Sequence, residues 1–206
     1  MIEAAAIICG YLIGSIPFGY LIGKMVSGKD VREGGSGATG ATNVTRQLGI
    51  KWGIPVAVLD ISKGAVPVIL TQKIAPAPEW LFAAVALATI IGHIYPVWLH
   101  FRGGKGISTA LGAAIVIAPW GSVIAVVAFI AAFAIGRLVS VGSLAAVVVY
   151  AVSVLAFGSK IGALSLGAKI FAVALPIIVI WTHRKNIGRI IKGEELSPIK
   201  GQKEIR

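Results

Sequence analysis

The stretch ISTALGAAIVIAPWGSVIAVVAFIAAFAIG, residues 107–136, decides the fold. It is apolar almost throughout and is interrupted only by Ala-Pro-Trp-Gly at 118–121. A helix needs about 20 apolar residues to cross a bilayer, and a Pro followed closely by Gly is a turn signal. The stretch therefore forms either one long membrane crossing or two short helices joined at that turn. The choice determines on which side of a membrane every later segment lies.

The rest of the chain has the composition of a membrane protein. Of its 206 residues, 57% are hydrophobic and 13% are charged, and the mean hydropathy is +0.90. A soluble domain carries about a quarter charged residues. We therefore expect a single all-α integral membrane domain over residues 1–206, with spans near 3–26, 52–72, 80–100, 107–119, 121–136, 141–158 and 162–182.

The positions of the basic residues favour the two-helix alternative for 107–136. With a hairpin there, the polar segments 27–51, 101–106, 137–140 and 183–206 all lie on one side of the membrane. All but three of the 19 Lys and Arg residues then lie on that side or border it, as the positive-inside tendency requires. The sequence thus predicts a bundle of seven short transmembrane helices in the cell membrane, with the N-terminus outside and the C-terminus cytoplasmic.

Several functional classes do not fit this pattern. The net charge of +11 would suit nucleic-acid binding only with a soluble basic domain, which the spans leave no room for, so no nucleic-acid partner is expected. The start, MIEAAA, lacks the basic segment of a secretory signal peptide. No close-spaced His, Cys or acidic pattern predicts a metal, no cofactor is expected, and the lone Cys9 is interpreted as a small membrane hydrophobe.

A glycine-rich segment, GGSGATGATNVTR at 34–46, contains G-x-G-x-x-G, and Asp60 follows the last of these glycines by twenty positions. That spacing is typical of a dinucleotide-binding βαβ unit. The unit needs a strand before the glycines and a soluble sheet, whereas here Asp60 falls inside a predicted span. The segment is then either a flexible cytoplasmic loop or a cradle for phosphate or carboxylate, because glycines let backbone N–H groups converge on an anion.

A second glycine-rich segment, FRGGKGIST at 101–109, lies on the same predicted side. It differs from a P-loop because Leu99 stands at the first glycine position and Gly106 follows the lysine. Its alternatives are a simple basic turn or an anion site in which Lys105 reaches a ligand at a helix N-terminus.

Two further segments carry polar groups at helical spacing. Asp60 and Lys63 are three residues apart inside a span, where charges usually pair in the bundle interior; an ion pair and a direct ligand contact both stay open. His183 and Asn186 would share one inward face if the last span continues as a helix. No nucleophile elbow in a strand–helix context predicts a Ser–His–Asp triad.

In this order, these segments resemble one family, the bacterial acyl-phosphate:glycerol-3-phosphate acyltransferases of the PlsY type. The resemblance covers nearly the whole chain and rests on GS at 14–15, GGSGATGATNVTRQLG at 34–49, DISKG at 60–64, GHIYP at 92–96, FRGGKGIST at 101–109, RLVS at 137–140 and HRKNIGRIIKGEE at 183–195. One departure is Ala38, which stands where the family loop usually has Asn.

The resemblance implies transfer of a fatty acyl group from acyl phosphate to the 1-hydroxyl of glycerol 3-phosphate, giving lysophosphatidic acid and phosphate at the cytoplasmic face. The implied partners are these two substrates and membrane lipid; the oligomeric state stays open, with a monomer as the simplest expectation. Catalytic roles are implied for Ser36, Arg46, Lys105, His183 and Asn186. Substrate-binding roles are implied for Gly35, Gly37, Gly40, Thr42, Asn43, Gly103, Gly104, Ser140 and Glu195.

The activated donor suggests direct attack by the glycerol hydroxyl, with catalysis by positioning and charge stabilisation. Arg46, Lys105 and the His183–Asn186 pair would hold glycerol 3-phosphate, and backbone N–H groups near 35–43 would hold the donor phosphate. Ser36 would align the reacting groups, and the base is either His183 or a substrate phosphate oxygen. A transporter of phosphate-bearing anions and a membrane scaffold are the competing classes.

Overall fold

The computed structural model describes residues 1–73, 77–163 and 165–196, and every regular element in these ranges is helical. The elements in chain order are α1 Ile2–Gly14, α2 Phe18–Ser27, η1 Val31–Glu33, α3 Ala41–Leu48, α4 Ile50–Gln72, α5 Glu79–Ile94, η2 Val97–Leu99, α6 Ile107–Ile117, α7 Pro119–Gly136, α8 Val139–Phe157, α9 Leu166–Thr182 and α10 Arg184–Ile191. The predicted all-α class is confirmed.

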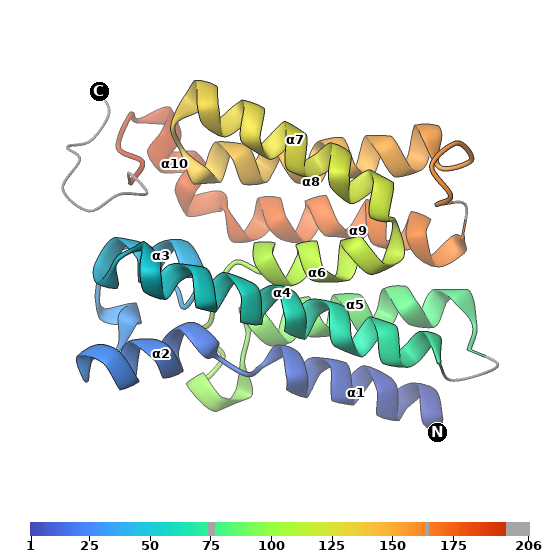
Figure 1. Ribbon diagram of the computed structural model, residues 1–206, viewed down its shortest axis with the longest axis horizontal. Helices are drawn as coiled ribbons and strands as arrows, with labels where there is room; N and C mark the ends of the chain where they lie inside the picture. Colours follow the sequence, from blue (N-terminus) through green and yellow to red (C-terminus); the bar gives the residue numbers. More distant parts are fainter. Residues whose placement is uncertain (74–76, 164, 197–206) are drawn as a thin grey trace.

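The long helices run side by side along the longest dimension of the molecule (Figure 1). The N-terminus lies at one end of this bundle, and the short helices α2, α3 and α10 lie at the other. The polar segments of the sequence are therefore gathered at a single end, which we call the loop end. The charge distribution predicted this gathering.

The chain breaks at Ala118, between α6 and α7, and reverses direction there (Figure 1). Pro119 occupies the first turn of α7, a position that proline tolerates because its missing N–H has no helical acceptor there. The hairpin chosen over a single crossing is therefore confirmed.

The number of membrane crossings is less clear-cut than the expected seven. Five spans in the described residues are long and apolar enough to cross a bilayer, and α9 and α10 add a sixth only if this pair, bent by 59°, is counted as one. The 11-residue α6 is too short by the same measure. Seven crossings, and the orientation of the two termini, stay predictions.

The first predicted span is not one helix. The span expected near 3–26 consists of α1 and α2, with a break at Ser15–Pro17. Pro17 cannot donate to the helix ladder, and the carbonyl of Ile16 instead accepts a hydrogen bond of 2.7 Å from the Lys63 ammonium group of α4. Lys63 also forms a buried ion pair of 2.8 Å with Asp60, which confirms the predicted pairing.

Two other boundaries differ from the expectation. The segment 27–51 contains α3, which packs through Val44 against Val56 of α4 and is separated from α4 only by Gly49 at φ +93. The span expected near 80–100 is helical only to Ile94, because Tyr95–Pro96 ends α5 and a short 3₁₀ turn follows. A buried contact thus makes part of a polar segment helical in α3, and a proline ends α5 within an apolar one.

Small residues let the helices approach closely, as the sequence predicts. A Cβ added at Gly112 of α6 would lie 1.9 Å from the carbonyl oxygen of Ile61 in α4. A Cβ at Gly64 of α4 would lie 2.0 Å from the carbonyl of Thr109 in α6. The backbone of α6 is thereby seated on α4, and its N-terminus is held at the loop end.

Candidate functional site

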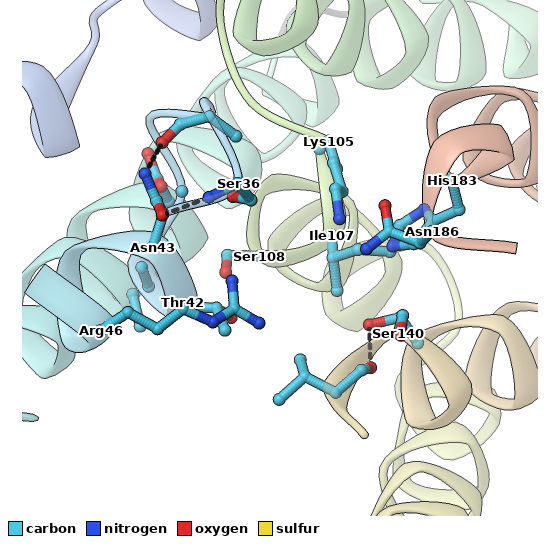
Figure 2. Close-up of a pocket in the computed structure, with 18 of the residues that line it drawn as sticks. Ser36, Thr42, Asn43, Arg46, Lys105, Ile107, Ser108, Ser140, His183 and Asn186 are labelled. Carbon is cyan, nitrogen blue, oxygen red and sulfur yellow. Dashed lines mark hydrogen bonds between the residues drawn. The ribbon is translucent and has the colours of Figure 1, made fainter. Parts of the chain in front are cut away.

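A polar cavity of about 240 Å³ opens at the loop end. Its walls come from all four polar segments, and of the residues expected in the site it is lined by Ser36, Gly40, Thr42, Asn43, Arg46, Lys105, Ser140, His183, Asn186 and Glu195. Figure 2 shows Arg46 and Lys105 directed from two sides toward the space that His183, Asn186 and Ser140 border. Segments far apart in sequence meet here: Arg46 and Leu196, which share a hydrogen bond, are separated by 150 residues.

Three helices begin at this cavity. Their first residues line it: Ala41 and Thr42 of α3, Ile107 and Ser108 of α6, and Val139 and Ser140 of α8. Within the described ranges, none of the three N-termini has a side-chain cap. Uncapped N-terminal N–H groups carry the positive end of the helix dipole, so the cavity presents three anion-binding helix ends at once.

Two cationic side chains add to this positive field. The Lys105 ammonium group makes no hydrogen bond or ion pair within the part of the chain that the structure describes. Burial, opposed only in part by Glu195, lowers the pKa of Lys105 to about 8. Arg46 donates from Nη2 to the carbonyl of Leu196 at 3.1 Å, which fixes the guanidinium at the cavity wall.

The glycine-rich segment 34–40 is shaped by Asn43. The Asn43 amide nitrogen donates to the carbonyls of Val31 and Ala38, each at 2.8 Å, and its oxygen accepts the backbone N–H of Ser36 at 2.9 Å. Gly35, at φ +59, leaves no room for a side chain beside that oxygen. Asn43 is buried at the wall and acts mainly by positioning the backbone of Ser36; direct substrate contact by its side chain stays a prediction.

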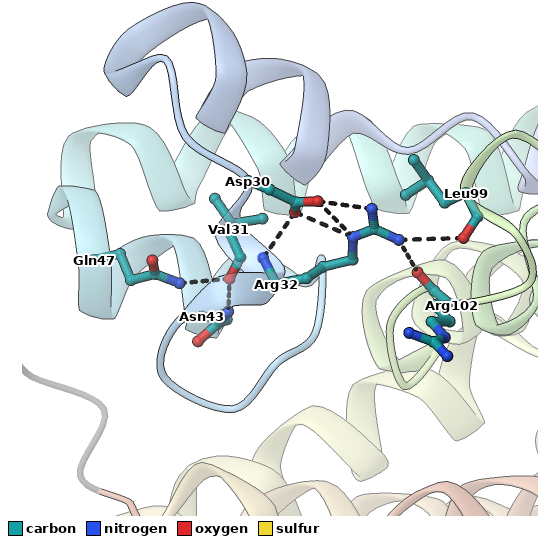
Figure 3. A network of polar contacts seen from close by, with 7 residues as sticks. All are labelled: Asp30, Val31, Arg32, Asn43, Gln47, Leu99 and Arg102. Atoms are coloured by element: carbon teal, nitrogen blue, oxygen red, sulfur yellow. Dashed lines mark hydrogen bonds and ion pairs between the residues drawn. The ribbon is translucent and has the colours of Figure 1, made fainter.

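The two glycine-rich segments are tied together by Arg32, a residue that sequence analysis did not single out. Figure 3 shows its guanidinium between the Asp30 carboxylate and the turn at 99–102. It pairs with Asp30 at 2.7 Å and donates to the carbonyls of Leu99 and Arg102 at 3.1 and 3.2 Å. The hydrogen bonds from Arg32 hold the pKa of Asp30 below its usual value.

The turn that Arg32 holds is strained. His100 and Phe101 both adopt left-handed φ angles, 53° and 60°, which cost energy for residues other than glycine. The same turn leads into Gly103, Gly104 and Lys105. The only sequence signal for Arg32 is the D-x-R spacing, which is too short to predict a contact about 70 residues away.

Four of the predicted binding glycines, Gly35, Gly37, Gly103 and Gly104, are not among the residues that line the cavity. The structure gives the last two a packing reason. A Cβ at Gly104 would lie 2.1 Å from Nε2 of His93, and one at Gly103 would lie 2.1 Å from the His93 carbonyl oxygen. These glycines let the Lys105 turn lie against α5, and contact with substrate stays a prediction for all four.

Glu195 organises the C-terminal wall. It accepts hydrogen bonds from Ser140 at 3.2 Å, from the Asn186 amide and from Arg189 at 2.9 Å. These contacts join the N-terminus of α8 to α10 across the cavity. The acid is therefore engaged with three protein groups, and its charge offsets part of the positive field at Lys105 and Arg46.

His183 lies just beyond the last residue of α9, where the chain bends into α10. Its Nδ1 is 2.9 Å from the carbonyl of Val179, so Nδ1 carries the proton and Nε2 is an acceptor. Burial, with the nearby Lys105 charge, lowers the pKa of His183 to about 4. The imidazole is neutral at physiological pH and suited to accepting a hydrogen bond.

The cavity also includes polar residues that were not assigned to the site. These are Asp60, His93, Ser108 and Ser143. Asp60 forms the ion pair with Lys63 and also lines the cavity, and its direct contact with a ligand stays a prediction. His93 Nδ1 is 3.6 Å from the Asp60 carboxylate. Ser108 stands within the second glycine-rich motif, and Ser143 lies one helical turn after Ser140, so helical spacing was the available signal for both.

Comparisons with known proteins agree with one another. The family model described as glycerol-3-phosphate acyltransferase matches residues 4–193. The glycerol-3-phosphate acyltransferase of Myxococcus xanthus is 44% identical over 192 residues, covering 93% of this chain and 97% of that one. Its counterpart in Anaeromyxobacter dehalogenans is 41% identical and covers 95% and 96%.

Two solved structures are also similar to this chain. They are crystal structures of PlsY, an integral membrane glycerol 3-phosphate acyltransferase, in its glycerol 3-phosphate form and its lysophosphatidic acid form. The first has a TM-score of 0.88 at 34% identity, and the second has a TM-score of 0.85 at 33% identity. Both comparisons cover at least 95% of each chain.

Proposed function

The chain belongs to the glycerol-3-phosphate acyltransferase family, and we propose that its polar cavity joins glycerol 3-phosphate to the acyl group of an acyl phosphate. Acyl transfer to glycerol 3-phosphate is the activity of the family and of this chain. The identity of the donor, the roles of individual residues and the membrane face are the proposed parts.

The observation that carries the proposal is the convergence of three uncapped helix N-termini with Arg46 and Lys105 on one cavity. Such a field favours multiply charged anions. An acyl phosphate donor and glycerol 3-phosphate bring one phosphate each. The cavity therefore has the electrostatics that a two-phosphate reaction needs.

Glycerol 3-phosphate is held from the side of Lys105. The ammonium group and the N-terminus of α6 bind its phosphate, and Arg46 reaches the same space from α3 (Figure 2). The Nε2 of His183 accepts a hydrogen bond from the attacking 1-hydroxyl and orients it. Asn186 and Ser140 fix this wall through Glu195.

The donor phosphate is held by the other wall. The N–H of Ser36, set by Asn43, and the first N–H groups of α3 face it, and the Ser36 hydroxyl aligns the acyl carbonyl. The glycerol oxygen attacks the acyl carbon, the bond from that carbon to the phosphate oxygen breaks, and inorganic phosphate leaves. A neutral imidazole with a pKa near 4 is a weak base, so the hydroxyl proton passes to a phosphate oxygen of the donor.

The protein is a multi-pass membrane protein, and we place the loop end at the cytoplasmic face of the cell membrane. The support is the concentration of Lys and Arg in segments that line or border the cavity. We also propose that the protein acts as a monomer. The family match argues against the transporter and scaffold alternatives.

The proposal is tested with the purified full chain in detergent, supplied with palmitoyl phosphate and radiolabelled glycerol 3-phosphate. We expect labelled lysophosphatidic acid and one phosphate released per product, with none formed from palmitoyl-coenzyme A. Arg46→Ala should lower the rate at least 100-fold, while Lys160→Ala, an exposed change at the opposite end of the bundle, should not. Transfer from the thioester alone, or equal rates in both variants, would contradict the proposal.

A further inference from the structure

A second cavity, also of about 240 Å³ but apolar, continues from the polar one into the bundle. The two share Ile107, Ser108, Phe129 and Ser143 in their walls. The acyl carbonyl and its chain belong to one molecule, so a donor that reacts in the polar cavity must place its chain in a space continuous with it. The apolar cavity is that space.

The helices that line the apolar cavity give it a defined depth. On α6 the wall runs from Ile107 to Ala114, and the walls on α7 (122–129) and α8 (143–150) cover the same stretch of helix. Seven residues correspond to about 10 Å along a helix. Tyr150 is the last residue of the α8 wall and so lies at the end away from the reaction.

Tyr150 has two properties that suit the end of a binding cavity. Its ring is only 1% exposed and is held edge-to-face by Phe171, with centroids 5.9 Å apart and planes at 87°. Its hydroxyl is fully buried and has no hydrogen-bond partner among the described residues. The hydroxyl therefore does not reach the cavity, and the ring alone shapes its far end.

We infer that Tyr150 sets the length of the acyl chain that the enzyme prefers. The ring closes the far end of the cavity, while the buried hydroxyl has no contact with the open space. Chains that would extend past the ring have no room.

This inference rests on the proposed function, because it requires a donor whose reacting carbonyl lies in the polar cavity. The experiment measures kcat/KM for a series of straight-chain acyl phosphates that differ by two carbons, at saturating glycerol 3-phosphate. Tyr150→Ala should move the preferred length upward, with a gain of about fourfold for each methylene that finds room. Tyr150→Phe keeps the ring and should keep the preferred length of the parent.

A change on a different helix should act in the opposite direction. Ala114→Leu, at the same depth on α6, should move the preference toward shorter chains. Phe157→Ala, on α8 but exposed and outside the cavity, is the matched control and should keep the parent profile. Size-exclusion chromatography checks that each variant is folded, and Tyr150→Leu, which also removes the ring, replaces Tyr150→Ala if that variant does not fold.

The outcomes separate the two proposals. No transfer by the parent from any acyl phosphate would contradict the proposed donor. Transfer by the parent with one chain-length profile shared by all folded variants would overturn the role of Tyr150 and leave the donor standing. Opposite shifts of the preferred chain length in Tyr150→Ala and Ala114→Leu, with an unchanged profile in Phe157→Ala, would support the role of Tyr150.

Discussion

The ammonium group of Lys105 makes activity depend on pH in a range that can be measured. Burial lowers its pKa to about 8, so the charge is present below pH 8 and is lost as the pH rises through that value. Because the charged form binds phosphate, kcat/KM for glycerol 3-phosphate should fall about tenfold for each pH unit above 8. A pH–rate profile checks this, and Lys105→Arg should lose the descending limb because a guanidinium stays charged.

The buried pair of Asp60 and Lys63 should matter for stability as a pair. Lys63→Met removes the ammonium group nearest to the buried Asp60 carboxylate, leaving it, among the described residues, only His93 Nδ1 at 3.6 Å, and should lower the free energy of unfolding by about 3 kcal/mol. The double variant Asp60→Asn, Lys63→Met removes both charges and should be the more stable of the two. Thermal unfolding in detergent compares them, and a double variant less stable than Lys63→Met would contradict this expectation, because the Asp60 carboxylate would then be stabilising without Lys63.

At the scale of single residues, the sequence predicted some contacts correctly and gave no indication of others. The pairing of Asp60 with Lys63 followed from two charges at helical spacing in an apolar span. The positioning role of Asn43 did not, because its partners Val31 and Ala38 offer only backbone carbonyls, and carbonyls leave no trace in a sequence. Arg32 was missed for the same reason.

The contact between α4 and α6 sets where Lys105 stands, since α6 begins two residues after it. A Cβ at Gly112 would meet the backbone oxygen of Ile61 at 1.9 Å, and backbone cannot move aside cheaply. Gly112→Ala should therefore destabilise the protein by about 1–3 kcal/mol and raise KM for glycerol 3-phosphate. Gly188→Ala, where nothing lies within 4 Å, is the control; equal stability of the two variants would exclude this seating.

The turn at 99–102 should lose its position without Arg32. Arg32→Gln removes the guanidinium that holds the carbonyls of Leu99 and Arg102, and we expect KM for glycerol 3-phosphate to rise about tenfold with a smaller change in kcat. Arg102→Ala removes an exposed charge from the same turn but keeps its carbonyl, so it should change KM little. If the two variants behave alike, charge rather than geometry links Arg32 to the site.

Helix boundaries followed from the sequence where proline or a change in polarity marked them, as at Ala118–Pro119. The predicted boundaries were wrong where contacts with other helices determine where a helix begins or ends. The break between α1 and α2 is supported by a lysine on another helix, and α3 is held against α4 through Val44 and Val56. Eight residues of a polar helix carry too few apolar positions to reveal that packing in advance.

At the level of the whole molecule, the distribution of Lys and Arg along the sequence was sufficient to predict which segments form the site. Counting basic residues on either side of 107–136 predicted that four polar segments share one end, and residues from all four line one cavity. The count of basic residues could not predict how many helices cross the membrane, because α6 is short and α9 bends into α10. The apolar cavity was likewise beyond reach, since its walls are ordinary membrane-facing residue types.

The central claim is that Lys105, Arg46 and the N-terminus of α6 bind the phosphate of glycerol 3-phosphate. Isothermal titration of glycerol 3-phosphate into the purified protein at pH 7 tests it most directly, with Lys105→Gln as the variant and Lys160→Gln as the control. We predict one site in the parent and the control, and a dissociation constant at least tenfold higher in Lys105→Gln. Unchanged binding in Lys105→Gln would contradict the account.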